Sequence, residues 1–433
     1  MLISGWGRYP TIDAQLQELT SPTRAAEHLA ADGPVIARGM GRSYGDSALA
    51  PHILSTRSLD RLHAFDPDEG TVDCDAGVTL AELIDVFLPR GWFLPVTPGT
   101  RFVSVGGAIA SDVHGKNHHL DGCFSAFVDS FDLLTASGEV LTCSADSHAE
   151  LFRATCGGMG LTGVILRARL RLRRVHSAFI DQVTLKAANL NEALDLFEAH
   201  GASTYSVAWI DCLASGESLG RSLLMLGEHA RNGALDLAPS RTLGVPVDMP
   251  GMLLNRHSIK AFNSLYFHRI RQPRTEQRID YRPFFYPLDG IAQWNRLYGR
   301  DGFLQYQFVI PREAGREGMR AILQRIAASG RGSFLAVLKA FGAANDNPLS
   351  FPIEGYTLAL DFKNERGLTA LLDELDRMVL AHGGRLYLTK DARMSAETFR
   401  QSYPRWEEFQ ALRERYGALG RFVSLQAQRL GLE

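Results

Sequence analysis

The sequence has few cysteines and almost no excess charge. Its 433 residues include 46 lysines and arginines against 48 acidic residues, which gives a formal net charge of −2. Since this balance offers no bulk attraction to nucleic acid, we expect no nucleic-acid partner. The few cysteines form no CxxC pair, which argues against a disulfide framework and favours reduced thiols in a cytoplasmic protein. They are Cys74, Cys123, Cys143, Cys156 and Cys212.

Long apolar runs are also missing. No stretch approaches the ~20 apolar residues that a membrane-spanning helix needs, and the segment Met1 to Arg8 lacks the apolar centre of a signal peptide. We therefore expect a cytoplasmic protein whose membrane contact, if any, is peripheral and at the inner membrane face. The length and the 45% hydrophobic residues predict two domains.

Helical and strand-like segments alternate along the chain, which predicts an α+β fold. We expect a first domain over 1–175, a substrate domain over 176–384, and a C-terminal segment, 385–433, that returns to the first domain. Helices are predicted over 22–32, 79–89, 191–200, 313–328 and 366–381, and strands over 34–38, 70–76, 131–135, 139–143, 163–173, 204–210, 303–310 and 385–389.

A basic segment, 253–282, holds seven lysines and arginines against two acidic residues. We interpret it as a solvated loop. A functional alternative is that it attracts an anionic lipid headgroup or a membrane surface.

Three glycine-rich blocks lie in the first domain. The block from Ala37 to Asp46 follows a strand-like segment and contains three glycines and two arginines, a composition suited to a diphosphate. A surface turn with solvated arginines would have the same composition. Further blocks cover 98–119 and 156–163, and together the three favour a long cofactor bound through main-chain groups. None has the spacing of a P-loop or of a Rossmann NAD site.

The histidines at 114, 118 and 119 raise the question of a metal site. Gly115 and Asn117 argue against the helix that this spacing requires, and no HExxH motif or cysteine pair completes a site. We expect no metal and favour a polar ligand cavity.

Several strings resemble one family of flavoproteins. HGKNHH (114–119) and FLQYQFVIP (303–311) are specific, and further matches extend nearly end to end. With these residues the sequence resembles the vanillyl-alcohol-oxidase-type flavoproteins, and within them the flavin subunits of two-component epimerases acting on a polyprenylphosphoryl ribose. The other matching segments are 5–8, 37–46, 98–113, 157–163, 294–299, 348–352 and 383–391.

The resemblance implies a two-domain, PCMH-type FAD-binding fold, with a substrate domain built on an antiparallel sheet flanked by helices. It implies FAD as cofactor, and because Tyr44 stands where many relatives have a flavin-linked histidine, we expect non-covalent FAD. The implied cofactor-binding residues are Ala37, Arg38, Gly39, Met40, Gly41, Arg42, Ser43, Tyr44, Gly45, Asp46, Ser47, Gly99, Ser104, Val105, Gly106, Gly107, Ser111, Asp112, Val113, His114, Ile165 and Tyr387.

The implied reaction removes a hydride from the 2′-hydroxyl carbon of the sugar to flavin N5, giving a 2′-keto sugar. A separate NAD(P)H-dependent short-chain reductase would complete a ribose-to-arabinose epimerisation. Lys390 is our first catalytic candidate, since desolvation can bring the pKa of a lysine toward the working pH. Tyr44 is the second candidate base, and His114 sets flavin electronics or binds phosphate. The implied substrate residues are Lys116, Trp209, Gln305, Gln307, Lys339 and Lys390.

Each of these residues has a simpler alternative. Lys390 can form an ordinary salt bridge, for which Asp391 is the nearest acid in sequence, and the others can be core or rim residues. The sequence also departs from the family pattern on the substrate side. Thr357 and Ala359 replace an asparagine and a cysteine, and Phe285 replaces a tyrosine, with Tyr286 next to it.

Two other functions stay open at this point. One is an FAD-dependent oxidase or dehydrogenase of a free polyol, an aldonolactone or a soluble sugar. The other, from a different class, is a metal- or nucleotide-binding module without redox activity.

Overall fold

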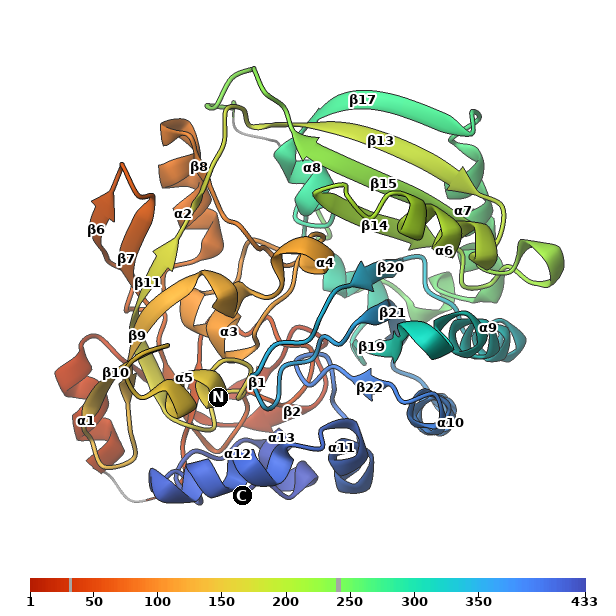
Figure 1. Cartoon of the computed structure of the whole chain (residues 1–433). Coiled ribbons are helices and arrows are strands. Elements are labelled where there is room, and N and C mark those ends of the chain that lie inside the picture. The colour runs from red at the N-terminus through yellow and green to blue at the C-terminus, as the bar shows by residue number, and fades with distance from the viewer. Residues whose placement is uncertain (31–32, 239–242) are drawn as a thin grey trace.

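The computed structural model describes residues 1–30, 33–238 and 243–433. Two large sheets organise the chain, with the first domain and the second sheet side by side and the C-terminal helices beneath the first domain (Figure 1). Helices combined with antiparallel sheets and smaller parallel ones confirm the predicted α+β class. The proposed division at residues 175 and 384 stays a prediction.

The first domain is built on a five-stranded antiparallel sheet in the order β10-β9-β11-β7-β6, and on a three-stranded parallel sheet in the order β3-β5-β4. Its strands are β1 (Leu2–Ser4), β2 (Thr11–Asp13), β3 (Gln15–Glu18), β4 (Ile36–Arg38), β5 (His52–Ser55), β6 (Leu62–Asp66), β7 (Thr71–Asp75), β8 (Trp92–Phe93), β9 (Val128–Leu134), β10 (Val140–Ser144), β11 (Val164–Arg171) and β12 (Arg173–Arg174). Its helices are α1 (Pro22–Ala30), α2 (Leu80–Phe87), α3 (Val105–Ala110), α4 (His118–Asp121) and α5 (Ala149–Thr155).

An eight-stranded sheet in the order β17-β13-β15-β14-β20-β21-β19-β22 forms the second region. Its strands are β13 (Phe179–Ala187), β14 (Tyr205–Ile210), β15 (Ser222–His229), β17 (Arg274–Asp280), β19 (Phe303–Pro311), β20 (Ala336–Phe341), β21 (Gly355–Lys363) and β22 (Arg385–Leu386). Helices α6 (Leu190–Ala199), α9 (Arg312–Ser329) and α10 (Leu368–Ala381) pack on this sheet, and α7 (Arg256–His268) and α8 (Tyr281–Phe285) accompany β17. A short pair, β16 (Leu243–Gly244) and β18 (Ile291–Ala292), lies outside it.

Local sequence rules account well for the helix ends. Thr79 and Glu82 form a capping box at the start of α2, as the sequence predicts, because each side chain bonds the backbone N–H of the other. A short 3-10 turn follows α2, and Gly91 ends it with φ of 82°. The predicted helix over 22–32 is described as far as Ala30, and its last two residues lie outside the described part of the chain.

Two predicted segments differ from the structure. The basic segment 253–282 is not a loop, because Asn255 and Ser258 form a capping box that begins α7, and β17 pairs with β13 along seven residues. Because the exposed surface of this segment is charged, its amino-acid composition resembles that of a loop. The strand predicted over 385–389 ends at Leu386, where the chain turns away from β19.

The C-terminal segment returns to the first domain. Its helices are α11 (Ala396–Ser402), which packs against α10 and β22, and α12 (Trp406–Arg415) and α13 (Leu425–Leu430), which lie beneath the first domain (Figure 1). Phe422 forms a parallel bridge with Val35, and the N–H of Leu425 donates to the carbonyl of Leu49. Among the described residues, no helix has the length and apolarity that a membrane crossing requires.

Candidate active site

One face of the eight-stranded sheet collects the predicted substrate residues. Alternate residues of a strand point to opposite faces, and paired residues of antiparallel strands share a face. The opposite face presents side chains such as Leu338 and Leu358 to the core beneath α9 and α10. By the register of β14, β20, β21 and β19, the shared polar face contains Trp209, Lys339, Thr357, Ala359, Asp361, Gln305 and Gln307.

Three lysines come together on this face without a carboxylate bonded to any of them in the described chain. Lys339 on β20 lies within electrostatic range of both Lys116 and Lys390. Burial lowers the pKa of Lys116 and that of Lys339 to about 7, with the charge of the other lysines a further cause for Lys339. Burial lowers the pKa of Lys390 to about 8. Such a cluster is costly unless an anion occupies it.

His114 lies at the centre of the site and is neutral. Burial, together with the charges of Lys339 and Lys390, lowers its pKa well below 6.5. Its Nε2 lies 3.2 Å from the amide nitrogen of Gln307, which is also 3.3 Å from the hydroxyl of Thr357. The Nδ1 atom of His114 is buried without a partner in the part of the chain that the structure describes. An unpartnered buried ring nitrogen of this kind suits contact with a bound ligand.

Tyr44 reaches the same site from the first glycine-rich loop. The ammonium of Lys390 lies 4.0 Å from the centre of the Tyr44 ring. The backbone N–H of Tyr44 donates to the carbonyl of Thr389 over 3.1 Å. Burial raises the pKa of the Tyr44 hydroxyl well above 10, and the nearby Asp361 carboxylate raises it further. Tyr44 is therefore protonated at neutral pH and can donate a hydrogen bond, but it does not fit the base role that the sequence offered as second choice.

The first loop fits a long cofactor bound through its backbone. Gly41 has φ of 62°, and a Cβ on Gly39 would lie 2.1 Å from Ser104 Oγ. The N–H groups of residues 40–43 donate to no other group of the described chain. Backbone donors lined by glycine are what a diphosphate needs. The residues of this loop, with Ala37, Met40, Ser43 and Ser47, stay the predicted FAD contacts.

The two arginines of that loop have protein partners. Arg38 donates to the carbonyls of Ser4 and Ala48 over 2.7 and 3.3 Å, and these bonds hold the loop against the segments that contain Ser4 and Ala48. The guanidinium of Arg42 lies 4.1 Å from the ring of Trp6 in a cation–π contact. These contacts help to shape the loop, and contact of either arginine with FAD stays a prediction.

The second glycine-rich block forms a helix beside that loop. Ser104 accepts a hydrogen bond from the N–H of Gly107 and begins α3, which contains Val105 and Gly106. The N–H of Gly106 donates to the carbonyl of Ala76. Gly99, Val113 and Ile165, the last on β11, complete the residues predicted to line the flavin, and their contacts stay predictions.

Asp112 joins the two halves of the site. Its carboxylate is fully buried and accepts hydrogen bonds from the side chains of Asn345, Asn347 and Ser350, 2.6 to 2.9 Å long. Since these residues belong to the β20–β21 connection, Asp112 ties that connection to the predicted flavin block. Any cofactor contact at Asp112 therefore comes from its backbone. Ser111 likewise accepts from the hydroxyl of Tyr387 at its carbonyl.

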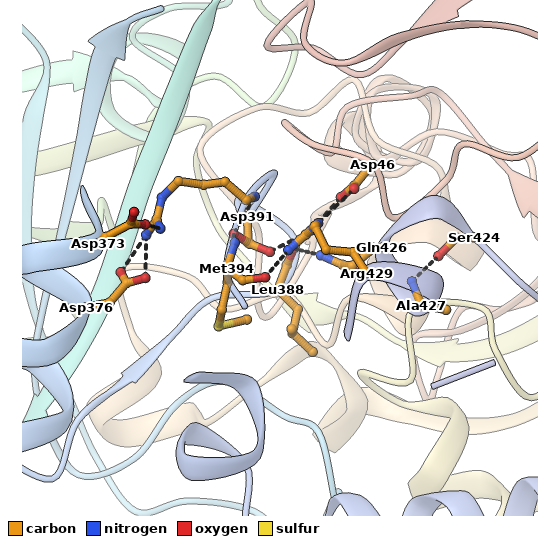
Figure 2. Close-up of polar contacts among 11 residues, drawn as sticks. Asp46, Asp373, Asp376, Leu388, Asp391, Met394, Ser424, Gln426, Ala427 and Arg429 are labelled. Carbon is orange, nitrogen blue, oxygen red and sulfur yellow. Dashed lines mark hydrogen bonds and ion pairs between the residues drawn. The ribbon is translucent and has the colours of Figure 1, made fainter. Parts of the chain in front are cut away.

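A buried ion network fixes the segment that bears Lys390. Figure 2 shows Arg429, from α13, between Asp46 of the first loop and Asp391. Both carboxylates lie 2.8 Å from Nη2 of Arg429. Gln426 donates to the carbonyl of Leu388 in the same network (Figure 2). Asp391 therefore pairs with Arg429, and the simpler alternative of a Lys390–Asp391 salt bridge is wrong.

Aromatic residues close the ends of the site. The ring nitrogen of Trp209 donates to the carbonyl of Phe334, and its ring lies 4.6 Å from that of Tyr266 on α7. Phe285 packs among aromatic rings of the core, while the hydroxyl of Tyr286 lies 2.7 Å from Thr97 Oγ1. Beside them, Lys116 donates to the carbonyl of Phe284 over 2.6 Å.

Sequence reasoning missed Asp361 and Arg429. Asp361 was open to prediction, because it stands two and four residues after Ala359 and Thr357 and so shares their face of β21. Arg429 had no local signal, since 383 residues separate it from Asp46. As for a metal, no group of three or more potential ligands gathers anywhere in the described ranges.

Comparison with known proteins gives the family. Residues 18–144 match an FAD binding domain. The decaprenylphosphoryl-β-D-ribose oxidase of Mycolicibacterium smegmatis is 40% identical over 453 aligned positions, which cover 99% of this chain and 97% of that protein. The chain belongs to the decaprenylphosphoryl-β-D-ribose oxidase family. It is an oxidoreductase, and its cofactor is FAD.

More distant relatives of this family member act on other molecules. The L-gulono-1,4-lactone dehydrogenase of Mycobacterium tuberculosis H37Rv is 24% identical over 94% of this chain and 91% of its own. The L-gulonolactone oxidase of Bos taurus is 32% identical over 37% of this chain and 36% of its own. The predicted resemblance and the FAD-dependent chemistry are thus confirmed.

Proposed function

We propose that this chain oxidises the 2′-hydroxyl of a polyprenylphosphoryl ribose to the 2′-keto sugar, the first half of a ribose-to-arabinose epimerisation. The similarity to decaprenylphosphoryl-β-D-ribose oxidase along 99% of the chain supports this substrate class. We further propose that the FAD is bound non-covalently.

One observation supports an anionic substrate above a neutral one: the cluster of Lys116, Lys339 and Lys390. Burial destabilises each ammonium, and the pKa of Lys339 falls further because the other lysines repel its charge. A phosphate diester placed against Lys116 and Lys339 would offset both effects at these two residues through charge-assisted hydrogen bonds. A free polyol or lactone would leave the cluster uncompensated.

The residues of the site divide the chemistry between binding and proton transfer. FAD, when bound, accepts the hydride from the sugar carbon. Lys390 is the group for the hydroxyl proton, since its pKa of about 8 leaves part of its population neutral near pH 8. Protonated Tyr44 donates a hydrogen bond toward the sugar or flavin edge. Neutral His114 and Gln307 add directional polar contacts without charge.

Helix α7 supports a lipid-linked substrate and a peripheral membrane contact at the inner face. Its Tyr266 packs on Trp209 at one end of the substrate face. On the same helix Phe262, which stacks on Tyr266, is 43% exposed, Leu265 is 74% exposed, and Lys260 is exposed as well. Exposed apolar side chains beside cations suit the boundary of an anionic membrane.

The product determines what kind of partner must follow. A 2′-keto sugar returns to an alcohol of opposite configuration only by receiving a hydride, which this oxidising site removes. We therefore propose a separate NAD(P)H-dependent short-chain reductase as the second half of the epimerase.

An anaerobic flavin-bleaching assay tests the proposal. Purified protein is mixed with polyprenylphosphoryl ribose, and absorbance near 450 nm is followed together with formation of keto sugar. Matched reactions contain ribose 5-phosphate, a neutral alkyl riboside or L-gulono-1,4-lactone. Bleaching by the lipid-linked sugar at least tenfold faster than by the other three is expected. Equal or faster bleaching by the neutral riboside or the lactone would contradict the proposal.

A further inference from the structure

Asp361 is a fully buried carboxyl group in the middle of β21, opposite Gln305 on β19. One carboxylate oxygen, Oδ1, accepts a hydrogen bond of 2.6 Å from Gln305 Nε2. The other, Oδ2, is buried and has no partner among the described residues. Its backbone N–H donates to Ser333 Oγ over 3.2 Å. A buried carboxylate with one oxygen left unpaired is costly, and it calls for a role that the fold alone does not supply.

The charge that acts on Asp361 is that of Lys390. Lys390 is the cation whose charge favours the ionised form of Asp361, and Asp361 is the charge that opposes the effect of burial on Lys390. Burial raises the pKa of Asp361 to about 7, while that of Lys390 is about 8. Among the described residues the two groups form no direct ion pair, and each affects the other through its charge.

The other groups facing this pair do not replace Asp361. Tyr44 is partly buried and Tyr298 is buried; burial raises the pKa of both phenols well above 10, and His114 is neutral. Lys339 carries either no charge or a positive charge, and a positive charge there disfavours a second one on Lys390. Asp361 is thus the negative charge available to an ammonium on Lys390.

We propose that Asp361 is the positioning residue for Lys390: its carboxylate stabilises the ammonium that forms when Lys390 takes the proton of the substrate hydroxyl. The O–H bond of the substrate breaks, and an N–H bond forms at Nζ of neutral Lys390. The hydride leaves the carbon that bears this hydroxyl and goes to the flavin, as in the proposed function. This inference rests on the proposed function for the identity of the proton donor. Asp361 keeps its charge throughout and acts as the aspartate of a hydrolase triad does on its histidine.

Gln305 orients the Asp361 carboxylate. Its amide nitrogen donates to Oδ1 of Asp361, and Gln305 also lowers the pKa of the nearby Tyr44 hydroxyl, against the larger effect of burial. The carboxylate is therefore held in one orientation, with Oδ2 left for the ammonium. A residue predicted to bind substrate thus fixes the charge that supports the base.

Competitive labelling of amines tests the charge pairing without turnover. The holoenzyme is treated with trace acetic anhydride across about pH 6 to 10, and acetylation of the Lys390 peptide is measured by mass spectrometry. We expect half-maximal labelling near pH 8 in the wild type. In Asp361→Asn the midpoint falls by roughly one pH unit, because the stabilising charge is gone. Asp361→Glu, which restores a carboxylate, moves the midpoint back toward 8.

Asp376→Asn is the matched control. Asp376 is another buried carboxyl group of this region, but it bonds Tyr306 and Arg393 on the other side of the sheet. Its replacement leaves the Lys390 midpoint unchanged. An Asp361→Asn midpoint equal to or above that of the wild type, with flavin content retained, would overturn the inference.

Turnover separates this inference from the proposed function. With polyprenylphosphoryl ribose, Asp361→Asn is expected to lower the plateau of kcat by roughly tenfold and to move its rising limb to lower pH, in parallel with the labelling. If the wild type fails to oxidise this substrate while the labelling midpoint still falls in Asp361→Asn, the proposed function fails and the charge pairing holds. If turnover occurs and the midpoint does not move, the pairing fails alone.

Discussion

Replacing Lys339 by methionine should make the protein more stable and worse at binding its substrate. Lys339 is partly buried on β20, and its pKa falls from the usual 10.5 to about 7 because burial and two neighbouring lysines oppose its charge. A gap of about 3.5 pH units corresponds to at most about 5 kcal/mol, at about 1.4 kcal/mol per unit. Because the side chain keeps some solvent contact, we expect about 1 to 2 kcal/mol of this in practice.

The sign of the effect depends on pH in a defined way. In the unfolded chain Lys339 is protonated up to about pH 10.4, whereas in the folded protein it loses its proton near pH 7. The penalty is therefore complete below pH 7, declines between 7 and about 10.4, and vanishes above that. The stabilisation in Lys339→Met should follow the same course, largest at pH 6 and absent near pH 10.5.

Substrate binding should change in the opposite direction. A charge-assisted hydrogen bond to a phosphate contributes about 1.5 to 3 kcal/mol, so its loss raises KM roughly 10- to 150-fold. We expect kcat to change little, since Lys339 binds the phosphate in the ground state and the transition state alike. Lys339→Arg, which keeps a charge, should retain most of the affinity.

Urea unfolding at two pH values and steady-state kinetics with polyprenylphosphoryl ribose measure both effects. Lys363→Met is the control, because Lys363 lies at the end of β21 and bonds Gly251 and Glu365 outside the lysine cluster. A Lys339→Met protein that is less stable than the wild type at pH 6, or that keeps its KM, would refute the reasoning.

Four further results are expected. In the free enzyme kcat/KM should fall as pH drops below about 8, where Lys390 becomes protonated; a flat profile between about pH 6 and 9 would count against Lys390 as the base. Arg429→Met leaves Asp46 and Asp391 buried without their arginine, and we expect the free energy of unfolding to fall by about 3 to 5 kcal/mol and bound flavin to be lost. Urea unfolding and the flavin-to-protein ratio measure the two effects. Retained flavin would show that the network is dispensable. Gly45→Ala should release flavin as well, because the new Cβ would lie 1.9 Å from the carbonyl oxygen of Asp391; full occupancy in this variant would show that the loop can move aside. Heat denaturation should release all flavin into the supernatant, and fluorescence that stays with the protein on a denaturing gel would show a covalent bond.

Much of this protein could be predicted from local sequence. The capping box at Thr79 and Glu82, the turn at Gly91 and the strands over 204–210 and 303–310 depend on contacts within a few residues. Family resemblance then supplied the cofactor, and the FAD match over 18–144 confirmed it. Helix α7 was missed because its stability comes from one capped end and from packing on Trp209, while its outer surface has the composition of a loop.

The sequence by itself determined the order of elements, the glycine loops and the kinds of side chain in the site. Only the tertiary structure decided which charges meet. It paired Asp391 with Arg429 instead of Lys390, and it left Lys390 facing Asp361. It also gathered three lysines that the sequence spreads over 275 positions, from Lys116 to Lys390. The physical reason is that the electrostatic energy of a buried charge depends on its spatial neighbours and on the water removed from it, and neither follows from distance along the chain.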